Sequence, residues 1–259
     1  MRATYIIFKR ELKSYFSSPI AYVVMTLFLL LIGVLFALYV SQFSSYSQQY
    51  LMESQRYPGT PVPNIHLNVF AGIFQDMGVI MLFLMPLLTM RMLAEEKRSG
   101  SVELLMTYPV RDYEVVLGKY LAGFAVFLIM LCITIIYPVM VQFLIDLNWA
   151  VIWINYLGLF LIGGSYLAIG ILFSSLTENQ IVAGACTFAS LLLLWLFSAF
   201  QHFSGPVVGE VFDYMSLLSH QIGFTRGVID SNDVVYFVSF IFLFLFLTLR
   251  TLESKKWRA

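Results

Sequence analysis

The sequence predicts an all-α polytopic membrane protein with six transmembrane helices, organised as one transmembrane domain over residues 1–259. Two observations on composition point to this class: 60% of the residues are hydrophobic and only 12% are charged. The third is a set of apolar runs long enough to cross the hydrocarbon core, which takes about 20 helical residues. These runs are Ile20–Val40, Phe70–Met90, Val115–Met140, Trp153–Phe173, Ile181–Phe203 and Val234–Leu252.

Lysine and arginine residues lie almost entirely on one side of the predicted membrane domain. If the six helices alternate in direction, only Arg56 and Arg226 fall on the opposite side. Short loops rich in these residues stay in the cytoplasm, so both termini are expected to be cytoplasmic. The net charge of zero says nothing about partners, because the distribution of the charges carries the signal.

A short amphipathic helix is predicted over residues 2–16, ahead of the first span. Apolar side chains recur at helical spacing and basic ones occupy another face, until Ser17-Ser18-Pro19 breaks the pattern. Such a helix lies along the membrane surface, with its cations among anionic lipid headgroups. A simple basic tail that orients the first span is the alternative. The apolar face holds Tyr5, Phe8, Leu12, Tyr15 and Phe16, and the basic face holds Lys9, Arg10 and Lys13.

Two outer segments differ in character. Residues 41–68 are rich in Ser, Gln and Tyr and contain three prolines, which predicts an irregular polar loop. Residues 204–233 contain apolar patches that are too short to cross a membrane and are broken by glycines. They predict two short re-entrant or interfacial helices on the outer side, with a loosely packed loop as the alternative.

The loop over residues 93–113 gathers charge between two apolar spans. The second span is expected to continue through Arg98 and to stop at Ser99-Gly100, because glycine favours the left-handed cap of a helix. Ser101–Thr107 can then form about two helical turns. Asp112 is the expected N-cap of the third span.

This loop also carries acidic residues that an ordinary cytoplasmic loop does not need. Cations alone are enough to orient a membrane protein, yet Glu95, Glu96 and Glu103 are present as well. A short helix ringed by charge can transmit force from a soluble partner. The alternative is an ordinary cytoplasmic loop that only sets the orientation of the protein in the membrane.

Several kinds of chemistry find no support in the sequence. There is no G-x-x-x-x-G-K-[ST] phosphate loop, since Gly118-Lys119 is followed by Tyr120 and lacks the upstream glycine. The middles of the spans are almost free of ionisable residues, which ion-coupled carriers usually require. No catalytic residue, metal ligand, cofactor or nucleic-acid partner is therefore expected in this chain, and a membrane-embedded enzyme is disfavoured.

The stretch EEKRSGSVELLMTYPVRDYEVVLGKYLAG, from Glu95 to Gly123, resembles the loop joining the second and third spans of ABC-2 type ABC transporter permeases. SSLTENQ and RGVIDSNDVVYF resemble the subgroup that contains the gliding-motility permease and the nitrous-oxide-maturation permease. The resemblance implies a multi-pass protein of the bacterial cytoplasmic (inner) membrane and a homodimeric path served by two cytoplasmic ABC ATPase subunits. These subunits would bind the ATP and Mg.

The resemblance also assigns roles to residues. It makes Ser101–Thr107 a coupling helix that docks on the ATPase, the helix over residues 2–16 a connecting helix, and spans one and five the faces toward the second permease copy. The implied coupling interface comprises Glu95, Glu96, Arg98, Ser101, Val102, Glu103, Leu105, Met106 and Glu178. The implied connecting helix contributes Phe8, Lys9, Arg10, Leu12, Lys13 and Phe16.

The expected function is thus that of a permease subunit, exporting a substrate with energy from a separate ATPase. The alternative is a membrane anchor that passes mechanical work to periplasmic or surface proteins without any substrate crossing. Membrane lipid is an expected partner in either case, and a periplasmic or membrane accessory subunit fits both. The sequence does not identify the substrate.

Overall fold

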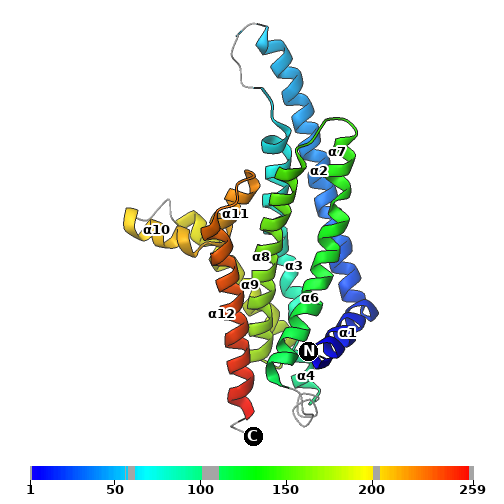
Figure 1. The fold of residues 1–259 in the computed structure, drawn as a ribbon, viewed down its shortest axis with the longest axis vertical. Coiled ribbons are helices and arrows are strands. Elements are labelled where there is room, and N and C mark those ends of the chain that lie inside the picture. Colours follow the sequence, from blue (N-terminus) through cyan, green and yellow to red (C-terminus); the bar gives the residue numbers. More distant parts are fainter. Residues whose placement is uncertain (1, 56, 58–61, 101–110, 201–204, 257–259) are drawn as a thin grey trace.

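The computed structural model describes residues 2–55, 57, 62–100, 111–200 and 205–256. Within these ranges the regular structure is entirely helical. Six helical segments are long and apolar enough to cross a membrane, as the sequence predicts. α1 (Arg2–Ser17) and the last turn of α12 (Ser231–Lys256) lie at the same end of the bundle (Figure 1), which is called the basal end below.

The helices follow the predicted order. The remaining spans are α2 (Pro19–Ser54), α3 (Ala71–Thr89) with the π-helical turn η1 (His66–Phe70) before it, α6 (Asp112–Thr134) continued by α7 (Ile136–Gln142), α8 (Trp149–Leu176) and α9 (Gln180–Phe200). The shorter helices are α4 (Ala94–Arg98), α10 (Pro206–Met215) and α11 (Leu217–Thr225). The predicted end of the fifth span, Phe203, lies outside the described residues.

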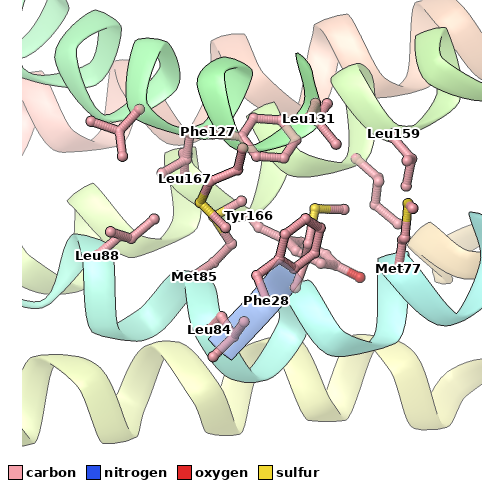
Figure 2. Close-up of a cluster of buried hydrophobic side chains, with 14 of the residues drawn as sticks. Phe28, Met77, Leu84, Met85, Leu88, Phe127, Leu131, Leu159, Tyr166 and Leu167 are labelled. Carbon is pink, nitrogen blue, oxygen red and sulfur yellow. The ribbon is translucent and has the colours of Figure 1, made fainter. Parts of the chain in front are cut away.

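α8 forms the centre of the bundle. In its most apolar stretch, 83% of the residues are buried by the rest of the chain. The corresponding share is 11% for α12 and 22% each for α2 and α9. Close approach makes this possible, since a Cβ added to Gly163 of α8 would lie 2.2 Å from the Phe127 ring of α6. Figure 2 shows the resulting core between α3, α6 and α8, with Phe28 of α2 reaching into it.

The first span is longer than the sequence analysis predicted. Residues 41–54, which were expected to belong to an irregular loop, continue α2. The stretch has no proline or glycine before Pro58, and Ser and Gln cost little in a helix that is already nucleated. At 1.5 Å per residue, the 36 residues of α2 span about 54 Å, well beyond a hydrocarbon core of about 30 Å.

The second span is not one continuous helix through α4, which corrects the prediction. A turn over residues 90–93 separates α3 from α4. Ser174 of α8 explains it, because its side-chain oxygen accepts the N–H groups of Leu93 at 2.9 Å and Ala94 at 3.1 Å. These groups would otherwise bond within a helix. The predicted stop is confirmed, since α4 ends before Gly100, whose φ of +70° is left-handed.

The start of the third span also differs in detail. Arg111, not Asp112, is the N-cap residue, and its backbone N–H donates to the Glu114 carboxylate at 3.3 Å. Asp112 is therefore the first helical residue, where its negative charge interacts favourably with the positive end of the helix dipole. Farther along, Pro138 accompanies the break between α6 and α7, because proline has no N–H for the carbonyl four residues earlier.

The two short helices predicted over residues 204–233 are present as α10 and α11. α11 is packed into the bundle: Gln221 Nε2 donates to the Phe74 carbonyl of α3 at 3.0 Å, and Phe224 lies against Gly158 of α8. α10 projects sideways from the bundle (Figure 1) and exposes apolar side chains such as Val207. The two helices therefore differ, since the chain covers α11 and leaves much of α10 uncovered.

Candidate functional site

Four charged side chains from three helices meet at the basal end. Lys119 Nζ of α6 lies 3.1 Å from Glu11 Oε1 of α1 and 3.0 Å from Glu96 Oε1 of α4. Arg10 Nη2 of α1 lies 2.7 Å from Glu11 Oε1 and 2.8 Å from Glu96 Oε1. Each carboxylate contacts both cations and the four charges cancel. These residues are called the ion cluster below.

The ion cluster is asymmetrically buried. The Lys119 side chain is 1% exposed and the Arg10 side chain 52%. Burial by itself would raise the pKa of Glu11, but the attraction of Lys119 and Arg10 outweighs it and holds that pKa below its ordinary value. Burial likewise works against the charge on Arg10, and the two carboxylates overcome it, so the pKa of Arg10 is raised. Glu11 and Arg10 are therefore ionised at neutral pH.

α4 is also bound to α8. Lys97 Nζ donates to the Ser175 carbonyl, and the Ser174 hydroxyl donates to the Met90 carbonyl at 3.2 Å. Together with the two N–H groups that Ser174 accepts, these bonds hold both ends of the short helix. α4 is consequently fixed to α1, α6 and α8 at once.

A second set of contacts holds α1 against the end of α3. The Tyr15 hydroxyl donates to the Leu88 carbonyl at 3.0 Å, and Arg91 Nη1 donates to Ser18 Oγ at 2.7 Å. The Arg91 guanidinium also lies 5.5 Å from the centre of the Tyr15 ring, within the range of a cation–π contact. The end of α1 and its junction with α2 at Ser18 are thereby both bound to the segment that ends α3.

α1 crosses α6 at a glycine. A Cβ added to Gly118 would lie 2.9 Å from Ile7 Cγ2 and 3.1 Å from the Thr4 carbonyl oxygen. Only a residue without a side chain allows this approach, which places Lys119 directly beside α1. The pair Gly118-Lys119 thus has a packing and electrostatic role at the helix crossing.

The last described residues of the charged loop lie beside the turn between α8 and α9. A hollow of about 480 Å³ is lined by Arg98 of α4 and by Glu178, Asn179, Gln180 and Ile181. The structure thus brings Arg98 and Glu178 of the predicted interface to one surface, although they are far apart in the sequence. Glu95 and Glu178 are exposed. Glu96 instead points into the ion cluster.

The other candidate residues divide into two groups. On α1, Phe8, Leu12 and Phe16 are half-buried against the core, whereas Lys9 and Lys13 are exposed, as the amphipathic pattern predicts. The predicted coupling helix and its candidates lie outside the described residues: Ser101, Val102, Glu103, Leu105 and Met106.

Sequence reasoning missed three residues of this site. Glu11 was not selected although its neighbours on α1 were, and Lys119 was considered only as part of an incomplete phosphate loop. A lone lysine in the second turn of an apolar span was the available signal, because such a charge needs a partner. Ser174 carried no such signal, since nothing in the sequence links it to α4.

Across the ranges that the structure describes, no group of three or more His, Cys, Asp or Glu side chains could hold a metal ion. The ion cluster is internally neutral, and each of its charged side chains pairs with the two of opposite sign. These ion pairs hold α1, α4 and α6 together.

Comparison with known proteins assigns the family. The family model described as ABC-2 family transporter protein matches residues 5–254. The search of curated proteins gave no match. Such domains are the non-catalytic transmembrane subunits of ABC transporters and generally pair with an ABC ATPase. The chain therefore belongs to the ABC-2 family of transporter proteins, as their multi-pass membrane component, the permease.

Proposed function

We propose that two copies of this chain form an export path in the bacterial inner membrane, driven by two cytoplasmic ATPase subunits that bind ATP and Mg. The basal end faces the cytoplasm in this proposal. The Lys/Arg bias supports the orientation. The coupling surface would comprise Ser101–Thr107 and the hollow beside Arg98 and Glu178.

The observation that carries the proposal is the ion cluster. α4 directly precedes the proposed coupling helix, and it is joined through Glu96 to Lys119 of α6 and Arg10 of α1. A displacement of the loop by the ATPase would therefore move α1 and α6 together. A loop with a purely topogenic role would not need such a connection.

The dimer faces proposed from the family resemblance are α2 and α9. Both helices are only 22% buried within the chain, so each leaves an apolar surface for a second copy or for lipid. In a chain whose Cys132 and Cys186 are replaced by Ala, single cysteines at Leu30 of α2 or Leu193 of α9, both exposed, should give disulfide-linked dimers. Phe242 of α12 is the matched exposed control and should not.

One observation favours the second candidate function, mechanical transmission to periplasmic or surface proteins. α2 extends about 54 Å and rises above the other helices (Figure 1), so its outer end could contact such a protein. The likeness to gliding-motility and nitrous-oxide-maturation permeases is compatible with either candidate. Replacing residues 44–52 by a Gly/Ser linker separates them, because mechanical output should be lost while permease-stimulated ATP turnover persists.

The primary test is purification from native membranes under mild detergent. The proposal expects a two-plus-two assembly of permease and nucleotide-binding subunit. Repeated recovery of the permease alone, with its neighbouring genes intact, would contradict it.

A further inference from the structure

An apolar groove lies between α1 and α6. Its volume is about 670 Å³, within the roughly 300–1,000 Å³ typical of ligand sites. On α6 the lining residues recur at three- and four-residue spacing from Tyr113 to Leu128, so they form one stripe about 22 Å long. Tyr5 and Phe8 of α1 form the facing wall.

The position of this groove favours an elongated apolar occupant. It starts at the basal end of a membrane span, and about 15 Å along the membrane normal reaches the middle of the hydrocarbon core. The chain leaves the stripe uncovered, since Leu117 is 38% and Leu121 is 44% exposed. An acyl chain matches this length, depth and chemistry.

Two basic side chains, Arg111 before α6 and Lys9 on α1, flank the groove. Arg111 Nη1 donates to the Tyr113 hydroxyl at 3.3 Å, and Tyr113 lines the groove. Lys9 lies four residues after the lining residue Tyr5, so it continues the same face of α1, and it is exposed. Asp112 and Glu114 of the first turn of α6 are the acidic residues that follow Arg111, and the Glu114 carboxylate accepts the N–H of Arg111. Glu11, two residues after Lys9, pairs with Arg10 and Lys119 in the ion cluster. A phosphate group at this end therefore finds the Arg111 guanidinium beside Tyr113, and a second cation, Lys9, on the helix that forms the facing wall.

We propose that this groove binds one phospholipid with an anionic headgroup, taken from the leaflet at the basal end. An acyl chain lies along Leu117, Leu121 and Leu128, and the headgroup contacts Lys9 and Arg111. The lipid contacts the same two helices that the ion cluster joins. A bound lipid thus holds α1 against α6 and supports the cluster, whatever substrate the permease moves.

The test measures lipid retention by the purified full-length chain in native mass spectrometry. Phosphatidylglycerol and phosphatidylcholine with identical acyl chains serve as probes. One phosphatidylglycerol per chain should be retained in preference to phosphatidylcholine. Removing the cations in Lys9→Gln and Arg111→Gln should weaken its retention about five-fold each. Lys13→Gln on the same helix is the matched control and should behave like the parent.

Filling the groove tests the acyl-chain site separately. Ala125→Trp should abolish retention of phosphatidylglycerol, whereas Ile133→Trp, on an exposed position of α6 outside the groove, should not. Leu121→Gln provides the same test with little change in size, should the tryptophan variant fail to fold. Equal retention of the two lipids, or unchanged retention in the groove variants, overturns the proposal. So does loss of the dimer in Ala125→Trp, because the groove would then hold a second copy of the chain.

Discussion

Replacing Lys119 by Met removes one buried charge from the ion cluster while keeping a side chain of similar length. At an effective dielectric constant of about 20, each of its contacts at 3.0 and 3.1 Å supplies about 5 kcal/mol of attraction, which desolvation largely offsets. The variant leaves Glu11 and Glu96 to share the half-exposed Arg10. Removing one partner of a buried pair costs about 3–5 kcal/mol, and we expect a loss in free energy of unfolding in that range.

Two comparisons give this expectation its meaning. Arg10→Gln removes the cation whose side chain is 52% exposed, so about 0–1 kcal/mol should be lost. Lys13→Met removes an exposed lysine of α1 outside the cluster and should have no effect. The double variant Lys119→Met/Glu96→Gln should be more stable than the sum of its single losses implies, with a coupling of about 0.5–3 kcal/mol.

The assay is equilibrium unfolding of the purified permease in mixed micelles, together with limited trypsin digestion. Breaking the cluster should release α4, so cleavage after Lys97 and Arg98 should become faster in Lys119→Met than in Arg10→Gln. If Lys119→Met unfolds at the same free energy as the parent and resists trypsin equally, the ion cluster is not a joint between the helices. Equal losses for Lys119→Met and Arg10→Gln would refute the role given to burial.

Three further expectations follow from neighbouring contacts. Gly118→Val should lower the thermal midpoint by pushing α1 away from α6, at a cost of about 1–3 kcal/mol, whereas Gly184→Ala, with its nearest neighbour at 3.4 Å, should be tolerated. The folded-state pKa of Glu11 is lowered, so its contribution to stability is present above the ordinary pKa of 4.5 and is lost as the pH falls through the lowered pKa. The thermal midpoint of the parent should fall over this pH range, and that of Glu11→Gln should not fall in the same way. Cysteines at Leu217 and Val207 should both resist a membrane-impermeant thiol reagent. Leu217 is buried by protein, and Val207 is exposed on α10, for which the sequence analysis expects a place in the outer leaflet.

Each of these expectations has a contrary outcome. A Gly118→Val protein as stable as the parent would mean that α1 does not cross α6 closely in solution. Parallel pH profiles for the parent and Glu11→Gln would mean that the Glu11 carboxylate does not contribute its charge to the ion cluster. Rapid labelling at Val207 alone would place α10 in water, and rapid labelling at Leu217 as well would contradict the packing of α11.

The spans and the amphipathic helix were predictable because their patterns are local. About 20 apolar residues and a 3.6-residue period are visible without knowing any neighbour. The left-handed Gly100 was predictable for the same reason, since a helix cap depends on adjacent residues. Two short helices over residues 204–233 followed from apolar patches too short to span.

The errors arose where a distant residue or a missing breaker decided the structure. Ser174 of α8 takes the backbone N–H groups that would have continued α3 into α4, and no local pattern reveals it. Residues 41–54 look like a loop by polarity, yet nothing in them stops a helix that α2 has already started. The polar composition was therefore a weaker guide than the absence of Pro and Gly.

The candidate site shows the same division. Lys119 and Glu11 are 108 residues apart in numbering and meet only because Gly118 lets α1 rest on α6. The sequence could indicate that a lysine in an apolar span needs a carboxylate, but several were available. It could not choose Glu11 and Glu96 among them, because that choice depends on the helix crossing.

The central claim is that the loop after α4 transmits force from an ATPase to the spans. The most direct measurement is permease-stimulated ATP turnover by the partner ATPase in reconstituted membranes, comparing the parent with Leu105→Asp and Glu103→Lys. A charge at Leu105 in an apolar docking groove should cost several kcal/mol and abolish both association and stimulation, while Glu103→Lys, a rim change worth about 0–1 kcal/mol, should retain most of each. If Leu105→Asp binds and stimulates the ATPase as the parent does, the loop only orients the protein in the membrane and the account fails.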